Sequence, residues 1–528
     1  MSSPIRRSRL LRRSRKVGAR KVRVPAVGTA LAVALLAMTP ATPVAAARSA
    51  TAYDFNGDGW ADLAVGVPGD PVGDLARAGA VQVINGSRTG LTASGSRTWN
   101  QGSPGIQGVP RTDDSFGASN TSADFDGDGY ADLAIGVPGG GLGAVAVLYG
   151  GRHGLSTRDQ LFHSSELGHQ DAWGATLAAG DFNGDGRADL AIGAEFPNRQ
   201  EGALTVLQGS DEGLTRNGAV RFTKDSLGIE GDSHTSAFGY RLAAGDVTGD
   251  GRDDLAVASR VNGLAGGEIY FLPGSAQGLT AAGSGLYTPE TPGLTPADTT
   301  FSVLGNDLAL GDFDGDGHDD LAIADDDAGP PGSTDCADHA ACPGAVLVLP
   351  GSASGPVVEG KQLWYQDARG VPGSSEGGDI FGGSLTTGDL NGDGRSDLSV
   401  GSPGEDLGSP AVLDGGAVNV IYGSPTGLSG EGAQLWSQRS AGIKGAAEKS
   451  DYFGRGVRIA DFGAGAAADL AVYSDGEAVG AAIAAGAVNV LYGSTHGVTA
   501  RDQFWSQDSP GIAGRAQRFD LFGTLSAH

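Results

Sequence analysis

Six copies of an acidic nine-residue loop carry the side chains with the clearest potential for chemistry. Each copy follows the pattern D-x-[D/N/T]-G-D-G-x-x-D, so oxygen-bearing side chains alternate at positions 1, 3 and 5, and another carboxylate follows at position 9. Calcium takes about six to eight hard oxygen ligands, and this spacing wraps a short segment around one ion. Glycines at positions 4 and 6 permit the positive φ angles of a tight wrap. The pattern therefore predicts calcium sites.

The expected ligands are the side chains at positions 1, 3, 5 and 9 and the backbone carbonyl at position 7. In chain order these residues are Asp54, Asn56, Asp58, Trp60 and Asp62; Asp124, Asp126, Asp128, Tyr130 and Asp132; Asp181, Asn183, Asp185, Arg187 and Asp189; Asp246, Thr248, Asp250, Arg252 and Asp254; Asp312, Asp314, Asp316, His318 and Asp320; and Asp389, Asn391, Asp393, Arg395 and Asp397. A carbonyl ligand at position 7 explains why the side chain there varies. We expect up to six structural Ca²⁺ ions. The alternative is a solvated acidic turn, and six copies of the full spacing argue against it.

Two copies of the loop depart from the pattern. Thr248 replaces Asp or Asn at position 3, so we expect that site to be weaker. A seventh copy, from Asp461 to Asp469, keeps both end carboxylates but lacks both middle oxygens, so we expect it not to hold calcium well. Without metal the clustered carboxylates repel one another, and folding should therefore depend on calcium.

The loops recur every 57 to 77 residues, and three other elements recur in step with them. An apolar run such as 79–84 leads to a Gly-Ser-type turn, a segment with a lone aromatic residue follows, and an aromatic-Gly pair such as Phe116-Gly117 precedes the next loop. Apolar runs of this length, bounded by Gly and Asp, are typical of buried strands. Four antiparallel strands in each of seven units predict an all-β fold, the seven-bladed β-propeller. A nonapeptide β-helix also binds calcium repeatedly, but its repeat is far shorter.

The order of elements at the two ends predicts how the ring closes. An aromatic-Gly pair precedes every later loop except 312–320, where Leu304-Gly305 takes its place. None precedes the first loop, and the chain ends with Phe522-Gly523 and five further residues. We expect the first blade to take a strand from the C-terminus, which removes free sheet edges. The alternative is that the last pair is left over from truncation.

These repeats resemble the FG-GAP repeats of the integrin α-subunit β-propeller and of secreted bacterial proteins. One unit shows the whole motif: Phe381-Gly382, the loop 389–397, and then Gly401-Ser402-Pro403. The resemblance covers residues 54–528. It implies a seven-bladed propeller with calcium in the loops between the first and second strands of several blades, and a role in binding or adhesion. We recognise no integrin leg or inserted domain in these residues, so the resemblance is not expected to extend to receptor signalling.

Composition and the N-terminal segment narrow the class of protein. The 528 residues include 62 Asp+Glu against 36 Lys+Arg, a formal net charge of −26, which argues against nucleic acid as a partner. Residues 1–23 are basic and precede an apolar run over 24–38 and an alanine-rich cleavage site, a pattern typical of a secretory signal peptide. A membrane anchor is the alternative, but the run is too short to span comfortably. We expect 1–47 to be a cleaved signal and 48–528 to be one secreted, monomeric propeller without a membrane span.

The face opposite the acidic loops is the candidate ligand face, because binding residues concentrate on loops held by a rigid scaffold. The candidates there are Asp70, Asp74, Arg77, Glu195, Arg199, Glu405, Asp406 and the insertion 325–343. Within the insertion, Cys336 and Cys342 predict a local disulfide, with free thiols or a metal site including His339 as alternatives.

No pairing of a catalytic nucleophile with a general base is recognisable in the sequence. We therefore expect an adhesion or ligand-binding module for a protein or glycan; the alternative is an extracellular hydrolase or lyase on the same scaffold.

Overall fold

Short apolar runs bounded by glycine and aspartate form the strands of the computed structural model, as their length predicts. The structure describes residues 50–528 except 140, 142, 168–172, 195–201, 229–235, 262–266, 297–298, 300, 302, 330, 332–341, 409–410, 464, 466 and 525–528. The chain divides into two units, Met1–Ala46 and Ala47–His528, and the first lies outside the described residues. The second unit is almost wholly β. Its described helical segments are α1 (Lys224–Leu227) and the 3-10 helix η1 (Ser164–Leu167).

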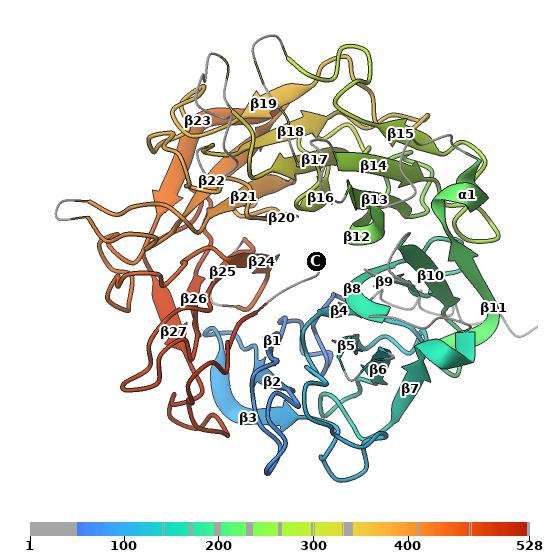
Figure 1. Cartoon of the computed structure of the whole chain (residues 1–528), viewed down its shortest axis with the longest axis vertical. Helices are drawn as coiled ribbons and strands as arrows, with labels where there is room; N and C mark the ends of the chain where they lie inside the picture. Colours follow the sequence, from blue (N-terminus) through green and yellow to red (C-terminus); the bar gives the residue numbers. More distant parts are fainter. Residues whose placement is uncertain are drawn as a thin grey trace, which may run out of the picture. The chain divides into compact units, whose positions relative to one another are not determined.

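Seven antiparallel sheets follow one another along this unit, and Figure 1 shows them arranged around a common centre. The first contains β1 (Leu63–Val67), β2 (Ala80–Asn85) and β3 (Thr92–Trp99). The other six have four strands each: β4 (Asn120–Ala123), β5 (Asp132–Val137), β6 (Ala144–Leu148) and β7 (Asp159–His163); β8 (Trp173–Gly180), β9 (Asp189–Ala194), β10 (Ala203–Gln208) and β11 (Thr215–Phe222); β12 (Ser236–Gly245), β13 (Asp254–Val261), β14 (Gly267–Leu272) and β15 (Gly285–Tyr287); β16 (Leu308–Gly311), β17 (Asp320–Asp325), β18 (Ala345–Leu349) and β19 (Gln362–Trp364); β20 (Ser384–Gly388), β21 (Asp397–Ser402), β22 (Ala417–Ser424) and β23 (Gly427–Trp436); β24 (Gly456–Ala460), β25 (Asp469–Ser474), β26 (Ala487–Leu491) and β27 (Asp502–Trp505). Each sheet is one blade, so the predicted seven-bladed propeller is confirmed.

The middle strands of the blades are buried on both faces. Every residue of β5 and β6 is buried, whereas most of the outer strand β11 is exposed or half-buried. Hydrophobic clusters join side chains of adjacent blades, so each blade covers the face of its neighbour. This two-sided burial explains why the middle strands appear in the sequence as continuous apolar runs rather than alternating ones.

The last blade and the C-terminal segment pack against the first blade. The backbone N–H of Gly523 donates to the carbonyl of Gly66 at 2.9 Å. The equivalent bond in the last blade joins the N–H of Gly454 to the carbonyl of Tyr473 at 3.1 Å. Phe522 shares one hydrophobic cluster with Val65 of β1. The C-terminal segment thus bonds to the first blade at the place of the expected inner strand, but among the described residues the first sheet has three strands and none from the C-terminus. Residues 525–528 lie outside the described part, and closure by a C-terminal strand stays a prediction. No described helix has the length and apolar character to cross a bilayer.

Candidate functional site

Each acidic loop after the first connects the inner strand of a blade to its second strand, and the first loop leads into β1. In the second blade, β4 ends just before Asp124 and β5 begins at the last loop position. One oxygen of Asp124 accepts the backbone N–H groups of Gly127 (2.7 Å) and Asp128 (3.2 Å), and the other accepts that of Gly129 (2.9 Å). Gly127 and Gly129 have φ angles of 71° and 88°, which glycine adopts without steric cost. The first carboxylate therefore holds the loop in the tight wrap that the sequence predicts.

Three carboxylates converge in the two loops that have Asp at position 3. Ligand oxygens of Asp124, Asp126 and Asp128 all lie within 4.8 Å of one another, as do those of the equivalent carboxylates in loop 312–320. Clustered carboxylate oxygens are the donors that calcium prefers. These residues therefore fit a hard divalent cation, to which they would supply both charge and ligands. Among the described residues, the position-9 carboxylates fall outside both groups.

The loops with Asn at position 3 keep the same wrap. Asn183 Oδ1 accepts the backbone N–H of Asp185 at 2.8 Å, and Asn391 Oδ1 that of Asp393 at 2.9 Å. The loop with Thr248 is different, because the Thr248 backbone N–H donates to the position-9 carboxylate at 2.8 Å. In the five loops with Asp or Asn at position 3, that side chain accepts the backbone N–H of position 5, and the Thr248 side chain makes no such bond among those described.

The position-9 aspartate anchors all seven loops to the Gly-Ser-type turn beside them. In each loop the turn glycine donates its backbone N–H to this aspartate, at 2.8 to 3.0 Å. The other oxygen of Asp132 accepts the N–H of Phe125 at 3.0 Å, and that of Asp469 accepts the N–H of Phe462 at 3.0 Å. Burial raises the pKa of Asp132 and of Asp469 to about 8. Since the degenerate loop makes the same bonds, position 9 has a structural role that does not depend on metal ligands.

A ring of hydrogen bonds between neighbouring loops was not anticipated from the sequence. The backbone N–H at position 8 of each loop donates to the position-1 carbonyl of the preceding loop, at 2.7 to 3.2 Å around all seven blades. Ala188 donates to Asp124 at 2.9 Å, for example, and Ala131 donates to Asp54 at 3.2 Å. The acidic loops therefore form one connected layer on one face.

The position-7 side chain also contacts the preceding loop, a role that the variety of residues at this position does not reveal. A Cβ on Gly57 would lie 2.7 Å from the ring of Tyr130, and a Cβ on Gly127 would lie 3.2 Å from Arg187. Position-4 glycine is thus required both for its positive φ and for the space that the next loop's position-7 side chain fills. Only knowledge of which loops are neighbours could have revealed this contact.

Guanidinium groups lie against several of the middle carboxylates. Arg252 pairs with Asp250 within one loop, and Arg158 pairs with Asp126 from the turn after β6. Each pair partly offsets the repulsion between carboxylates. A cation bound in such a loop would compete with the arginine for the same oxygen.

Part of the predicted ligand face can be located. Arg77 pairs with Asp113 at the surface, and Glu405 is half-buried beside Gln366. Glu195, Arg199 and Cys336 lie outside the described residues. Cys342 is buried, and the disulfide with Cys336 stays a prediction.

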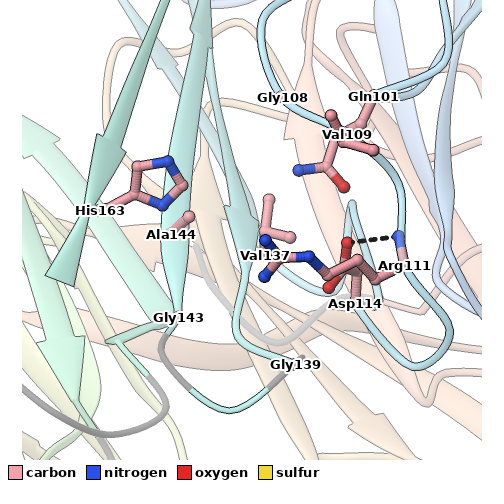
Figure 2. Close-up of a pocket in the computed structure, with 10 residues that line it drawn as sticks. All are labelled: Gln101, Gly108, Val109, Arg111, Asp114, Val137, Gly139, Gly143, Ala144 and His163. Carbon is pink, nitrogen blue, oxygen red and sulfur yellow. Dashed lines mark hydrogen bonds between the residues drawn. The ribbon is translucent and has the colours of Figure 1, made fainter. Parts of the chain in front are cut away.

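A pocket of about 210 Å³ opens on this face between the first and second blades (Figure 2). The Gln101 carboxamide, the Asp114 carboxylate and the Arg111 guanidinium gather on one side, and His163 lies across from them. Asp114 accepts the backbone N–H of Arg111 at 2.8 Å, and burial raises its pKa. This mixture of donors and acceptors suits a polar ligand. The pocket lies on the predicted face, but none of these four residues was singled out from the sequence.

Comparison with known proteins supports the assignment of the repeats. The FG-GAP repeat model matches residues 46–84, 116–148, 173–207, 238–272 and 381–421, so the chain contains FG-GAP repeats. It is 34% identical to integrin alpha-PS2 of Drosophila melanogaster over 40% of its length, 32% identical to phosphatidylinositol-glycan-specific phospholipase D of Homo sapiens over 40%, and 28% identical to human integrin alpha-IIb over 52%. The chain spans 15%, 26% and 25% of those proteins, respectively.

Proposed function

We propose that this FG-GAP repeat protein is an exported, calcium-stabilised propeller that binds an extracellular protein or glycan. The convergence of Asp124, Asp126 and Asp128 within 4.8 Å supports calcium binding most directly. Similarity to integrin α subunits supports a role in binding or adhesion. The basic and apolar N-terminal pattern supports export, with residues 1–47 as the signal.

The proposed ligand surface is the face that carries the pocket at Gln101, Arg111, Asp114 and His163. The acidic loops occupy the opposite face and are joined to one another by hydrogen bonds, so they suit a structural role. Because ligand binding and calcium binding are assigned to opposite faces, the loops of the ligand face can vary in sequence while the acidic loops stabilise the ring.

A glycan array and a panel of extracellular matrix proteins, both probed in millimolar calcium, test the binding proposal. We expect selective binding that the substitutions Arg111→Ala and His163→Ala weaken and that Glu431→Gln, at an exposed position of the outer strand β23, leaves intact. Wild-type binding by both pocket variants would contradict the assignment of the ligand surface to this pocket.

A hydrolase or lyase is the second candidate, and the similarity to a phospholipase D supports it. The same preparation is therefore assayed against phosphodiester, glycoside and polyuronate substrates. Turnover that follows the protein through purification would replace the binding proposal with the enzymatic one. N-terminal sequencing of the protein recovered from culture medium tests export separately, and a start near residue 48 is expected.

A further inference from the structure

A second polar arrangement repeats at four junctions between blades, on the face opposite the acidic loops. In each case a glutamine two residues after a tryptophan is followed, thirteen residues later, by an aspartate just before an aromatic-Gly pair. The four pairs are Gln101 with Asp114, Gln366 with Asp379, Gln438 with Asp451, and Gln507 with Asp520. All eight residues have exposed fractions of 8% or less. Because the same polar residue types are buried at the same positions of four repeats, we infer that they have a specific structural or binding role.

At three of these junctions the next blade contributes a second carboxylate. The glutamine donates its amide N–H to that group, from Gln366 to Glu405 at 2.6 Å, from Gln438 to Glu477 at 2.5 Å and from Gln507 to Asp70 at 3.2 Å. The backbone also brings the carboxylates together. The N–H of Gly404, next to Glu405, donates to the carbonyl of Asp379 at 3.1 Å, and Gly69, next to Asp70, makes the same bond to Asp520.

The amide oxygen of each of these glutamines has no hydrogen-bond partner among the described residues. At the first junction of the three, Asp379 already accepts the backbone N–H of Glu376 at 2.7 Å. Burial, together with the charge of Glu405, raises the pKa of Asp379 to about 7. A buried amide oxygen near one buried and one half-buried carboxylate is unfavourable unless a donor or a positive charge joins them.

At the fourth junction, that of Gln101 and Asp114, the second carboxylate is missing and an arginine supplies a positive charge. Gly140 stands in the sequence where Glu405 stands in its blade, and Arg111 stands where Glu376 does. The positive charge of Arg111 opposes the effect of burial on the pKa of Asp114. Figure 2 shows the Arg111 guanidinium beside Asp114 and below the Gln101 carboxamide. One junction thus has its own cation, whereas the neighbouring charges that act on Asp379, Asp451 and Asp520 are those of other carboxylates.

We propose that the three other junctions each bind a divalent cation, with Ca²⁺ the best match, through the glutamine amide oxygen and the two carboxylates. One neutral and two charged hard oxygens, completed by water, suit calcium. Each ion would join two blades. The three ions would hold together the arc from the blade of β16–β19 to the blade of β1–β3, which includes the blade whose acidic loop, 461–469, has lost its middle ligands.

Equilibrium dialysis against CaCl₂, with bound metal measured by elemental analysis, tests the proposal on the full secreted chain. The triple variant Asp70→Asn/Glu405→Gln/Glu477→Gln should bind three fewer Ca²⁺ per chain than the wild type. Glu431→Gln removes the same charge from an exposed position and should not change the count. Asp126→Asn should lose one ion through its acidic loop, so failure of the junction sites is distinguishable from failure of the proposed calcium loops.

An unchanged calcium count in a triple variant with native circular dichroism and elution volume would overturn the proposal. So would loss of glycan binding by that variant without loss of calcium, because the junctions would then be sugar sites. If the triple variant does not fold, Asp70→Asn and Glu405→Gln are measured singly. Each should lose one ion, and wild-type counts in both would refute the proposal.

Discussion

The backbone N–H of Ala61 donates a 2.7 Å hydrogen bond to the carbonyl of Asp461 and so joins the first acidic loop to the seventh. The equivalent bond links all the remaining pairs of neighbouring loops, which makes the layer a closed ring. The seventh loop cannot offer the middle calcium ligands, yet it keeps both end aspartates. Its retained residues are those that take part in the ring, since Asp461 supplies the carbonyl and Asp469 anchors the turn.

Removal of calcium should lower Tm sharply, and its return should restore Tm. With a dissociation constant of about 10⁻⁴–10⁻³ M, 10 mM calcium stabilises each occupied site by about 1.4–2.7 kcal/mol. Because hydrogen bonds connect the loops, we expect a single cooperative shift rather than separate local transitions. Thermal melts by circular dichroism in EDTA and in CaCl₂ measure this, with MgCl₂ as the control. An unchanged melt would refute structural calcium.

Asp469→Asn should destabilise the protein to the same extent with and without calcium. The substitution replaces one acceptor oxygen by an amide that faces a backbone N–H, which costs about 1–3 kcal/mol at a buried site. Asp126→Asn is the matched comparison, because it alters a predicted ligand and should reduce mainly the calcium-dependent part of Tm. Equal calcium dependence of the two losses would show that position 9 acts in loop 7 as a ligand.

Gly57→Ala should destabilise the protein more than Gly59→Ala. Both glycines have positive φ, 70° and 92°, so both substitutions carry backbone strain of about 1–2 kcal/mol. Only the Cβ on Gly57 would also collide with Tyr130, whereas nothing lies within 4 Å of one on Gly59. Urea unfolding of the two variants measures the difference. The double variant Gly57→Ala/Tyr130→Ala should recover part of the loss, and equal stabilities of the two single variants would argue against the contact.

The fold and the acidic loops could be predicted because both depend on local, repeated patterns. The wrap of Asp124 around Gly127 and Gly129 lies within one loop, so its spacing is visible in the sequence. Contacts between repeats could not be assigned in the same way, since the fit of Tyr130 over Gly57 requires the blade geometry. The pairs of glutamine and aspartate can be recognised in the sequence by their constant spacing. Their contact with Glu405 or Asp70 cannot, because those residues belong to the next blade.

Deletion of residues 519–528 should destabilise the whole ring. It removes the bond from Gly523 to Gly66 and takes Phe522 out of the hydrophobic cluster that joins the first and last blades. Loss of a buried phenylalanine alone costs about 3–5 kcal/mol. Differential scanning calorimetry measures the effect, with deletion of 525–528 as a milder comparison. A wild-type melt for the longer deletion would contradict closure by the C-terminus.

Metal-free protein should become less stable as the pH rises from 5 to 8. Burial raises the pKa of Asp132 and Asp469 to about 8, far above the value of about 3.9 in an unfolded chain. The folded state therefore keeps these protons where the unfolded state has released them. The associated stability is present at low pH and is lost as the pH rises towards 8.

Calcium should reverse much of this loss, because a bound cation compensates the charge that deprotonation creates in the ligand loops. The increase in Tm caused by calcium is therefore expected to be larger at pH 8 than at pH 5, as measured on dialysed protein in matched buffers. Asp469→Asn should flatten the metal-free pH slope without changing the pH dependence of the calcium effect, because its loop lacks the middle ligands. A metal-free Tm that rises between pH 5 and 8 would show that the buried aspartates are not protonated in the folded state.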